Sequence, residues 1–275
     1  MIVKRSEIDR LSADIRRIID GQALDLRDNL EGRLSILKND IHTLAGLLNE
    51  QASNLKKEKM ALSDTLADIS HQLKTPLTAM SVMIELLESA PPDKTAEFIL
   101  NLKQGLTQTK WLVSALLKMA KLESGNVAFT KARITAGELL ALALQPLQIL
   151  LDIKDQNVKL EGDADFYCDK NWTAEALTNI IKNASEHSPA GSTIDVTVGS
   201  NPLASWIAVS DKGPGIPMGN MKSLFKRFGG QGTGIGLPLA LAIMQGQNGD
   251  LEADGGDNKN GATFTLKFYG KIKSI

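Results

Sequence analysis

The chain has 275 residues, 43% of them hydrophobic and 23% charged, so it is long enough for two or more domains with separate cores. A net charge of −1 at pH 7 and only 4% aromatic residues argue against a nucleic-acid-binding protein. A single cysteine excludes an intrachain disulfide, and with only 3 histidines the sequence argues against a zinc site. Because no stretch approaches about 18 apolar residues and no signal peptide opens the sequence, we expect the chain as given to be cytoplasmic.

Residues 1–50 predict a helical relay followed by a coiled coil. An amphipathic run over residues 8–19 stops at Gly21, which is typical of a helix C-terminus. From Leu34 onwards, apolar residues recur in alternating steps of three and four, the heptad pattern of a coiled coil. Two successive steps of four over residues 44–52 form a stutter, which locally unwinds a supercoil. Periodicity leaves open whether this segment is a plain oligomerisation stalk or a place where register or rotation changes.

Residues 51–125 predict a helical hairpin that presents His71. The apolar stripe of the first helix leaves His71 outside its seam, and Pro76 predicts a kink because it cannot donate to the carbonyl of Gln72. The helix is expected to end near Glu88 and the next to run over residues 94–123, with Asp93 as its N-cap. Two such helices bury little alone, so we expect a homodimer that closes a four-helix bundle.

Residues 126–275 predict an α+β sandwich with helices on one face of a mixed sheet. Short β-type runs alternate with longer amphipathic runs, which indicates strands separated by helices. The expected strands are 158–160, 165–168, 193–198, 206–210 and 262–268, and the expected helices lie near 135–152, 171–187 and 235–247.

The helix that ends at His187 carries Asn179, Asn183 and His187 at four-residue spacing, so they share one face. An asparagine amide oxygen is a hard, neutral ligand that suits Mg²⁺ already carrying phosphate oxygens and waters. Since asparagine disfavours helix interiors, we interpret this ladder as functional.

Two glycine-rich stretches follow the asparagine ladder. At the end of the strand 206–210, Asp211 can accept the exocyclic amine of adenine, and Gly213 and Gly215 let the backbone approach the base. Further on, Gly232, Gly234 and Gly236 open a helix whose free amides can cradle phosphates. Each stretch alone is weak evidence, but the three elements in this order predict a nucleotide site.

Taken together, these segments resemble the cytoplasmic part of a two-component sensor histidine kinase. Residues 71–76 (His-Gln-Leu-Lys-Thr-Pro) resemble the H box of the dimerisation and phosphotransfer domain. Four further segments resemble, in order, the boxes of the ATP-binding fold shared with Hsp90, gyrase and MutL (GHKL). They are residues 179–187 (N box), 211–215 (G1 box), 224–228 (F box) and 232–236 (G2 box). The resemblance covers about residues 60–270.

The resemblance implies a role for each matching residue. His71 would be the phosphoacceptor, with Gln72 and Thr75 beside it in the catalytic set, and Asn183 would be the Mg²⁺ ligand. ATP would be bound by Asn179, Lys182, Asn183, His187, Asp211, Gly213, Gly215, Ile216, Arg227, Gly232, Thr233, Gly234, Ile235, Gly236, Leu237 and Thr263. Within this set, Lys182, His187 and Arg227 are candidates to neutralise phosphate charge. The implied partners are a second copy of the chain and the receiver domain of a response regulator.

Two positions depart from the family pattern. Many relatives have an acid directly after the phosphoacceptor, but this chain has Gln72, which cannot act as a base. Many also have a basic residue three positions after the second asparagine, where this chain has Glu186. Apart from these two positions, a nucleotide-clamp ATPase without a phosphorylated protein intermediate and a catalytically silent dimeric scaffold remain as alternative hypotheses.

The N-terminal segment resembles a HAMP relay. The resemblance rests on the amphipathic run over residues 8–19, on Gly21 and on Leu-Glu-Gly-Arg-Leu at residues 30–34, although the usual early proline is missing. HAMP relays usually follow a transmembrane helix. We therefore expect Met1–Arg5 to mark the cytoplasmic edge of a membrane span that is absent from this chain, with the full-length protein in the cell membrane.

Overall fold

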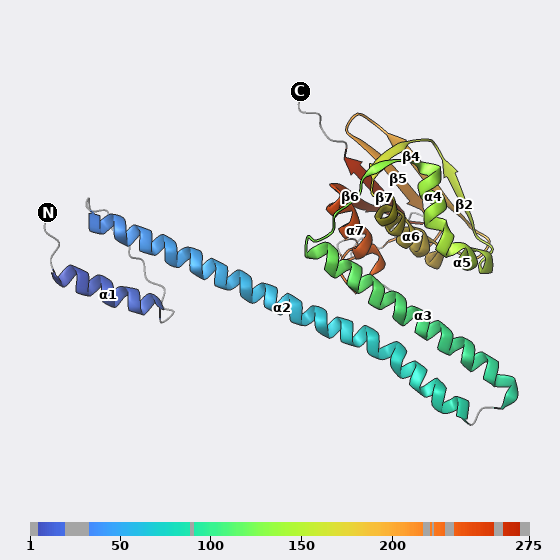
Figure 1. Ribbon diagram of the computed structural model, residues 1–275, viewed down its shortest axis with the longest axis horizontal. Coiled ribbons are helices and arrows are strands. Elements are labelled where there is room, and N and C mark those ends of the chain that lie inside the picture. The colour runs from blue at the N-terminus through green and yellow to red at the C-terminus, as the bar shows by residue number, and fades with distance from the viewer. Residues whose placement is uncertain are drawn as a thin grey trace. The chain divides into compact units, whose positions relative to one another are not determined.

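The computed structural model describes residues 5–19, 33–88, 91–216, 221, 223–228, 234–255 and 261–269 (Figure 1). The chain divides into two units, Met1–Ile69 and Ser70–Ile275. The expectations placed on Gly21 and on residues 30–32 lie outside the described residues.

The first unit contains α1 (Arg5–Ile19) and the first part of α2 (Arg33–Glu88). The amphipathic run of α1 buries Leu11, as its spacing predicts. Along α2 several heptad positions are exposed, among them Leu44, Leu55 and Leu62, whereas Ile41 and Ile69 are half-buried. An apolar stripe in water is what a coiled coil would cover with a second helix, so the coiled coil stays a prediction.

In the second unit, α2 continues to Glu88 and α3 spans Pro92–Glu123. The helix end at Glu88 is confirmed, and Pro76 lies inside the continuous helix. The N-cap of α3 is Pro91, so the prediction of Asp93 was wrong: proline at the first helical position fixes a helical φ and lets the helix begin earlier. Gly125, with φ +67°, follows the end of α3 in the left-handed conformation that glycine commonly adopts after a helix.

The remainder forms the predicted sandwich. Its helices are α4 (Ala136–Leu144), η1 (Gln145–Leu147), α5 (Gln148–Ile153), α6 (Lys170–His187) and α7 (Gly236–Gly246). Its strands are β1 (Ala132–Thr135), β2 (Asn157–Glu161), β3 (Asp165–Cys168), β4 (Thr193–Ser200), β5 (Ala204–Ser210), β6 (Gly249–Asp254) and β7 (Thr263–Tyr269). The sequence did not predict β1 or β6.

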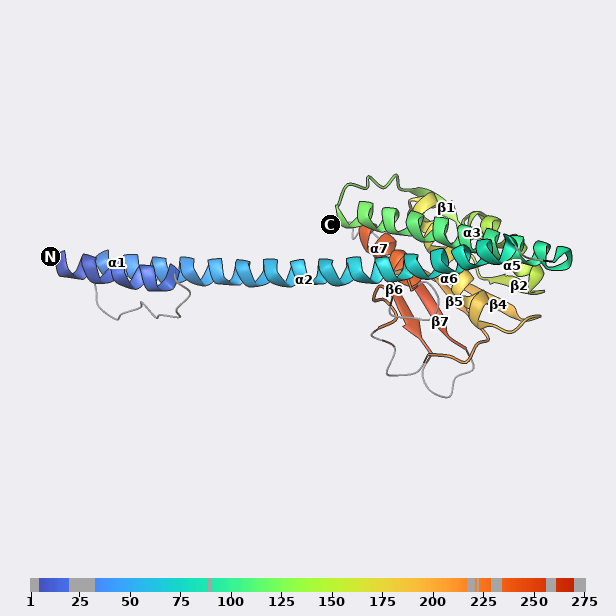
Figure 2. The same ribbon diagram turned by 90° about the horizontal axis from the view of Figure 1, so that it is seen from below.

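The main sheet has five strands in the order β2-β4-β5-β7-β6, with β2 parallel to β4 and the other pairs antiparallel. This is the mixed sheet that was expected. Strands β1 and β3 form a separate antiparallel pair. Helices α6 and α7 lie on the same side of the main sheet (Figure 2).

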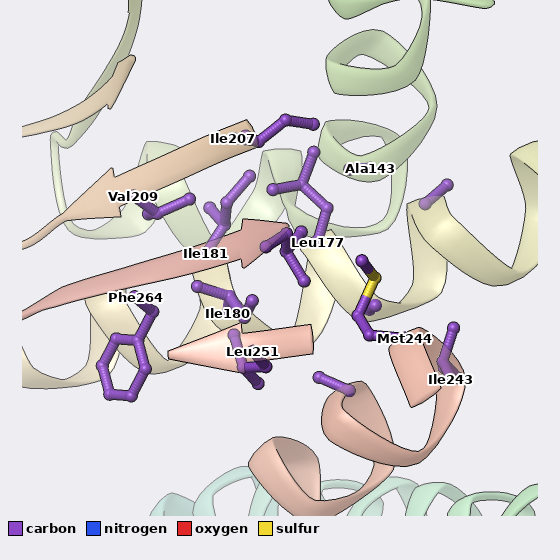
Figure 3. Close-up of a cluster of buried hydrophobic side chains, with 14 of the residues drawn as sticks. Ala143, Leu177, Ile180, Ile181, Ile207, Val209, Ile243, Met244, Leu251 and Phe264 are labelled. Carbon is purple, nitrogen blue, oxygen red and sulfur yellow. The ribbon is translucent and has the colours of Figure 1, made fainter. Parts of the chain in front are cut away.

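The core lies between the sheet and these helices. Figure 3 shows Ile207, Val209 and Phe264 from the strands meeting side chains of α6 and α7. Leu177, Ile180, Ile181, Ile243 and Met244 supply the helical side, each no more than 1% exposed. This packed layer fixes the C-terminal end of α6 and the end of β5, where the candidate site begins.

Among the described residues, Ala136–Ile153 is one helical stretch long and apolar enough to cross a membrane by length and hydropathy. The expectation that no apolar stretch approaches about 18 residues was therefore wrong for Ala136–Ile153. The stretch is divided among α4, η1 and α5, and its buried Leu139, Leu140, Leu147 and Leu151 belong to the sandwich core. It is accounted for as part of the sandwich.

Helix α3 differs from expectation in what its apolar side covers. Leu112, Ala115 and Met119 are 2–3% exposed and belong to the same core cluster as α4, α6 and α7, whereas Leu106 and Leu117 are exposed. The sequence predicted the apolar side of this helix for the bundle centre. In the structure, part of that side packs against the sandwich.

Candidate functional site

The first part of the site is the segment of α2 around His71. His71 is exposed, as its position outside the apolar stripe predicts, whereas Gln72 is half-buried. The hydroxyl of Thr75 donates to the backbone carbonyl of His71 at 3.2 Å. Such a bond is common for helical threonines, and its oxygen can still accept a further hydrogen bond. Pro76 follows inside the helix without an N–H group of its own.

The second part is the asparagine ladder on α6, a helix capped by the carboxylate of Asp169. Asn179 is 4% exposed and its Nδ2 donates to the carbonyl of Glu175 at 2.9 Å, which leaves its oxygen for other partners. Asn183 lies one turn later and is half-buried, with no side-chain hydrogen bond to any residue that the structure describes. The ladder therefore presents one amide oxygen held by packing and one that is open.

Asp211 is the centre of the third part, directly after β5. It is 5% exposed, and its Oδ1 accepts from the backbone N–H groups of Gly213 at 2.8 Å and Ala262 at 3.0 Å. Within the described part of the chain, no donor is found for its second oxygen. The carboxylate is thus fixed by one oxygen and keeps the other as an acceptor.

The glycines after Asp211 allow the backbone of this loop to lie close to neighbouring atoms. A Cβ on Gly213 would lie 2.8 Å from the carbonyl oxygen of His187, so only glycine fits between α6 and this loop. Gly215 has φ +82°, which also favours glycine. The side chain of His187 itself is exposed. Beside Asp211, the hydroxyls of Ser210 and Thr263 lie 2.8 Å apart, so Thr263 reaches the same neighbourhood.

The glycine-rich stretch at the start of α7 lies against the asparagine ladder. A Cβ on Gly236 would lie 3.4 Å from Oδ1 of Asn179. Gly234 has φ +60° and accepts from the N–H of Phe228 at 2.8 Å. Among the described residues no side chain caps α7 at its N-cap Ile235, so the N–H groups of Gly236 and Leu237 are not used by a cap. Gly232 and Thr233 lie outside the described residues.

The apolar residues of the predicted ATP-binding set are wholly or partly buried. Ile235 is fully buried and Ile216 is 7% exposed, while Leu237 packs against the core. The backbone N–H of Ile216 donates to the carbonyl of Gly255 at 2.8 Å. Their side chains therefore hold the loops that frame the site.

Two of the predicted cations, Lys182 and Arg227, contact α3. Nζ of Lys182 lies 4.3 Å from the centroid of the Trp111 ring, a cation–π distance. The guanidinium of Arg227 pairs with the carboxylate of Glu123, and burial lowers the pKa of Arg227. Trp111 and Glu123 were not predicted as part of the site, because a helical pattern does not indicate which distant residue a surface side chain contacts.

The residues present suit a nucleotide with Mg²⁺. No group of three or more His, Cys, Asp or Glu is placed to hold a metal in the part of the chain that the structure describes. A metal here would depend on a neutral amide such as Asn183 together with phosphate oxygens, which is how Mg²⁺ is commonly bound beside nucleotides. The close approach at Gly213 and the open oxygen of Asp211 provide a place for a flat base.

Comparison with known proteins agrees with this geometry. Residues 61–125 match the "His Kinase A (phospho-acceptor) domain", and residues 168–271 match the "Histidine kinase-, DNA gyrase B-, and HSP90-like ATPase" family. The sensor histidine kinase WalK of Bacillus subtilis is 27% identical over 279 residues, which cover 94% of this chain and 45% of that protein. The signal transduction histidine-protein kinase BaeS of Escherichia coli is 24% identical over 255 residues, covering 88% of this chain and 55% of BaeS.

Solved structures share the fold. The Acinetobacter baumannii histidine kinase AdeS has a TM-score of 0.62 at 22% identity, over 72% of this chain and 97% of that one. The histidine kinase ThkA, in complex with the response regulator protein TrrA, has a TM-score of 0.64 at 18% identity, over 82% of this chain and 66% of that one. The chain spans about half the length of the curated relatives it matches.

Proposed function

Because the chain belongs to the two-component sensor histidine kinases, we propose that it phosphorylates His71 with ATP and passes the phosphoryl group to an aspartate of a response regulator. The observation that carries this proposal is an exposed histidine on α2 in the same chain as the buried carboxylate of Asp211, which uses only one oxygen to bind its own loop. We also propose that another conformation removes phosphate from the regulator.

Adenine recognition rests on Asp211. Its Oδ1 is held by the N–H groups of Gly213 and Ala262, so the other oxygen would accept the exocyclic amine of the base. A buried carboxylate that accepts this bond discriminates against bases that present an acceptor at the same place. Thr263, hydrogen-bonded to Ser210, would line the same side of the base.

Mg²⁺ would be held by Asn183, with Asn179 assisting. When bound, Mg²⁺ neutralises negative charge that develops on the phosphate oxygens. Asn183 offers an open amide, and the oxygen of Asn179 faces the start of α7 near Gly236. The N–H groups of Gly236 and Leu237 would donate to phosphate oxygens, because no side-chain cap uses them and they lie at the positive end of the helix dipole.

In the transfer step, a ring nitrogen of His71 would attack the γ-phosphorus of ATP. The new N–P bond forms as the bond to the β–γ bridging oxygen breaks and ADP leaves. The ring then gives up its N–H proton, which Gln72 cannot accept and which would pass to water because His71 is exposed. An aspartate oxygen of the regulator would next attack the phosphorus as the N–P bond breaks, and the leaving ring nitrogen would take up a proton from water to restore the imidazole.

Assembly as a homodimer would cover the remaining apolar surface of the hairpin. Leu77 and Leu86 of α2 and Leu106 and Leu117 of α3 are each about half exposed or more. Pairing with a second hairpin would bury them in a four-helix bundle. We propose residues 51–125 as this dimerisation unit, 126–275 as the ATP-binding unit and 1–50 as a HAMP-like relay.

Labelling with γ-³²P-ATP and Mg²⁺ tests the proposal. A label that is stable in base and lost in acid, present in the wild type and absent from His71→Gln, is the expected result. His42→Gln, at another histidine of α2, is the matched control, which we expect to keep the label. Release of inorganic phosphate without protein labelling would instead support a nucleotide-clamp ATPase.

A further inference from the structure

We propose that Trp111 and Glu123 of α3 are positioning residues that hold the cations Lys182 and Arg227 away from the phosphates of ATP. The packing of α3 against the sandwich then corresponds to a resting state. When α3 separates from the sandwich, both cations become available to bind the phosphates of ATP. This inference rests on the proposed function, because the inference takes the phosphates of bound ATP as the partners of both cations.

Lys182 is the residue before the proposed Mg²⁺ ligand Asn183. Its Nζ lies 4.3 Å from the Trp111 ring centroid and 3.8 Å from the carboxylate of Glu186, and its side chain is 32% exposed. An ammonium that already contacts a ring face and a carboxylate binds a phosphate less strongly, because it must first leave these partners. Trp111 and Lys182 both line an open groove between α3 and α6, so the side chain has room to swing out.

Arg227 is held by the same helix farther along. Its guanidinium pairs with the carboxylate of Glu123, the last residue of α3. The arginine side chain is 28% exposed, and burial lowers its pKa, although the guanidinium stays charged at neutral pH. Phosphate oxygens and Glu123 would compete for one guanidinium, since both accept its N–H groups in the same geometry.

The two contacts are coupled because α3 is one rigid element. Trp111 and Glu123 are twelve residues apart, which is ~18 Å along a helix. Between them, Leu112, Ala115 and Met119 are buried in the sandwich core, and Lys118 pairs with Glu175 of α6 at 2.7 Å. The same docking therefore restrains both cations, and loss of the docking would release them together.

Two single variants test the restraint. Glu123→Gln removes the charge at a 54% exposed side chain, and Trp111→Leu removes the ring face while keeping apolar volume. Glu97→Gln, at another exposed carboxylate of α3, is the matched control. Calorimetry would measure binding of Mg-ATP and of adenosine, and γ-³²P-ATP labelling of His71 would give KM and kcat.

We expect each variant to tighten Mg-ATP binding and lower KM by ~2- to 5-fold, the scale of one cation–π contact or one exposed ion pair. Adenosine, which has no phosphate, should bind as in the wild type, and Glu97→Gln should change neither ligand. Mg-ATP affinity that is unchanged or weaker in both variants would overturn the inference. If no variant is labelled at His71, the proposed kinase function fails, yet the comparison of Mg-ATP with adenosine still decides whether α3 restrains the cations. Should Trp111→Leu lose its cooperative thermal transition, Glu123→Gln alone decides.

Discussion

Replacing Asp211 by asparagine should change which purine the protein prefers. Oδ1 of Asp211 accepts from Gly213 and Ala262, and an asparagine oxygen can keep both bonds. The second oxygen becomes an NH₂ group, which opposes the amine of adenine donor to donor but can donate to the O6 atom of guanine.

The magnitude follows from the bond that is lost. A hydrogen bond to a charged group contributes about 1.5–3 kcal/mol, so ATP affinity should fall by ~10- to 150-fold. GTP affinity should rise or hold, since its acceptor gains a donor. Because both backbone bonds are kept, the midpoint of thermal unfolding should move little. Asp211→Ala is the matched control: it removes both backbone bonds as well, so it should lower stability and weaken both nucleotides.

Calorimetric titration with ATP and GTP, each with Mg²⁺, measures the ratio of the two affinities. Equal losses for ATP and GTP in Asp211→Asn would refute this reasoning, because they would mean that the carboxylate supports the loop without reading the base. Thermal unfolding of the same samples separates a loss of structure from a loss of recognition.

Three further predictions concern the metal, the threonine and assembly. Asn183→Ala should weaken Mg-ATP by at least ~10-fold while leaving metal-free ATP nearly unchanged, and calorimetry showing equal losses would remove Asn183 from the metal site. Thr75→Ala should keep labelling of His71 within a few-fold but slow dephosphorylation of the regulator by ~10-fold, the value of one hydrogen bond of ~1.4 kcal/mol; rates that fall together would mean that Thr75 only supports its helix through the His71 carbonyl. Residues 34–124 alone should form a helical dimer, and a monomer by light scattering would contradict the bundle.

Much of the sandwich could be predicted because its strands and helices carry strong patterns. The strand with Ile207 and Val209 alternates, and the helix with Leu177, Ile180 and Ile181 repeats at helical spacing. Strand β6, by contrast, buries only Leu251 and begins at Gly249, so its own residues carry little β signal. It is held in place by antiparallel pairing with β7, a tertiary effect.

The candidate site was predictable in its residue types and less so in its contacts. Glycine spacing anticipated the tight approach at Gly213, which the carbonyl of His187 makes necessary. Periodicity told which side of α3 is apolar, but it could not tell that Leu112 and Met119 would pack against the sandwich. For the same reason, the pairing of Arg227 with Glu123, more than 100 residues earlier, had no local signal.

Phosphorus NMR of the purified chain with Mg-ATP tests the central claim most directly, because it observes the bond that the account requires. We predict that an N–P phosphoramidate resonance grows as ADP appears, and that it is missing from His71→Gln. ADP and inorganic phosphate in equal amounts, with no N–P resonance in the wild type, would contradict the account.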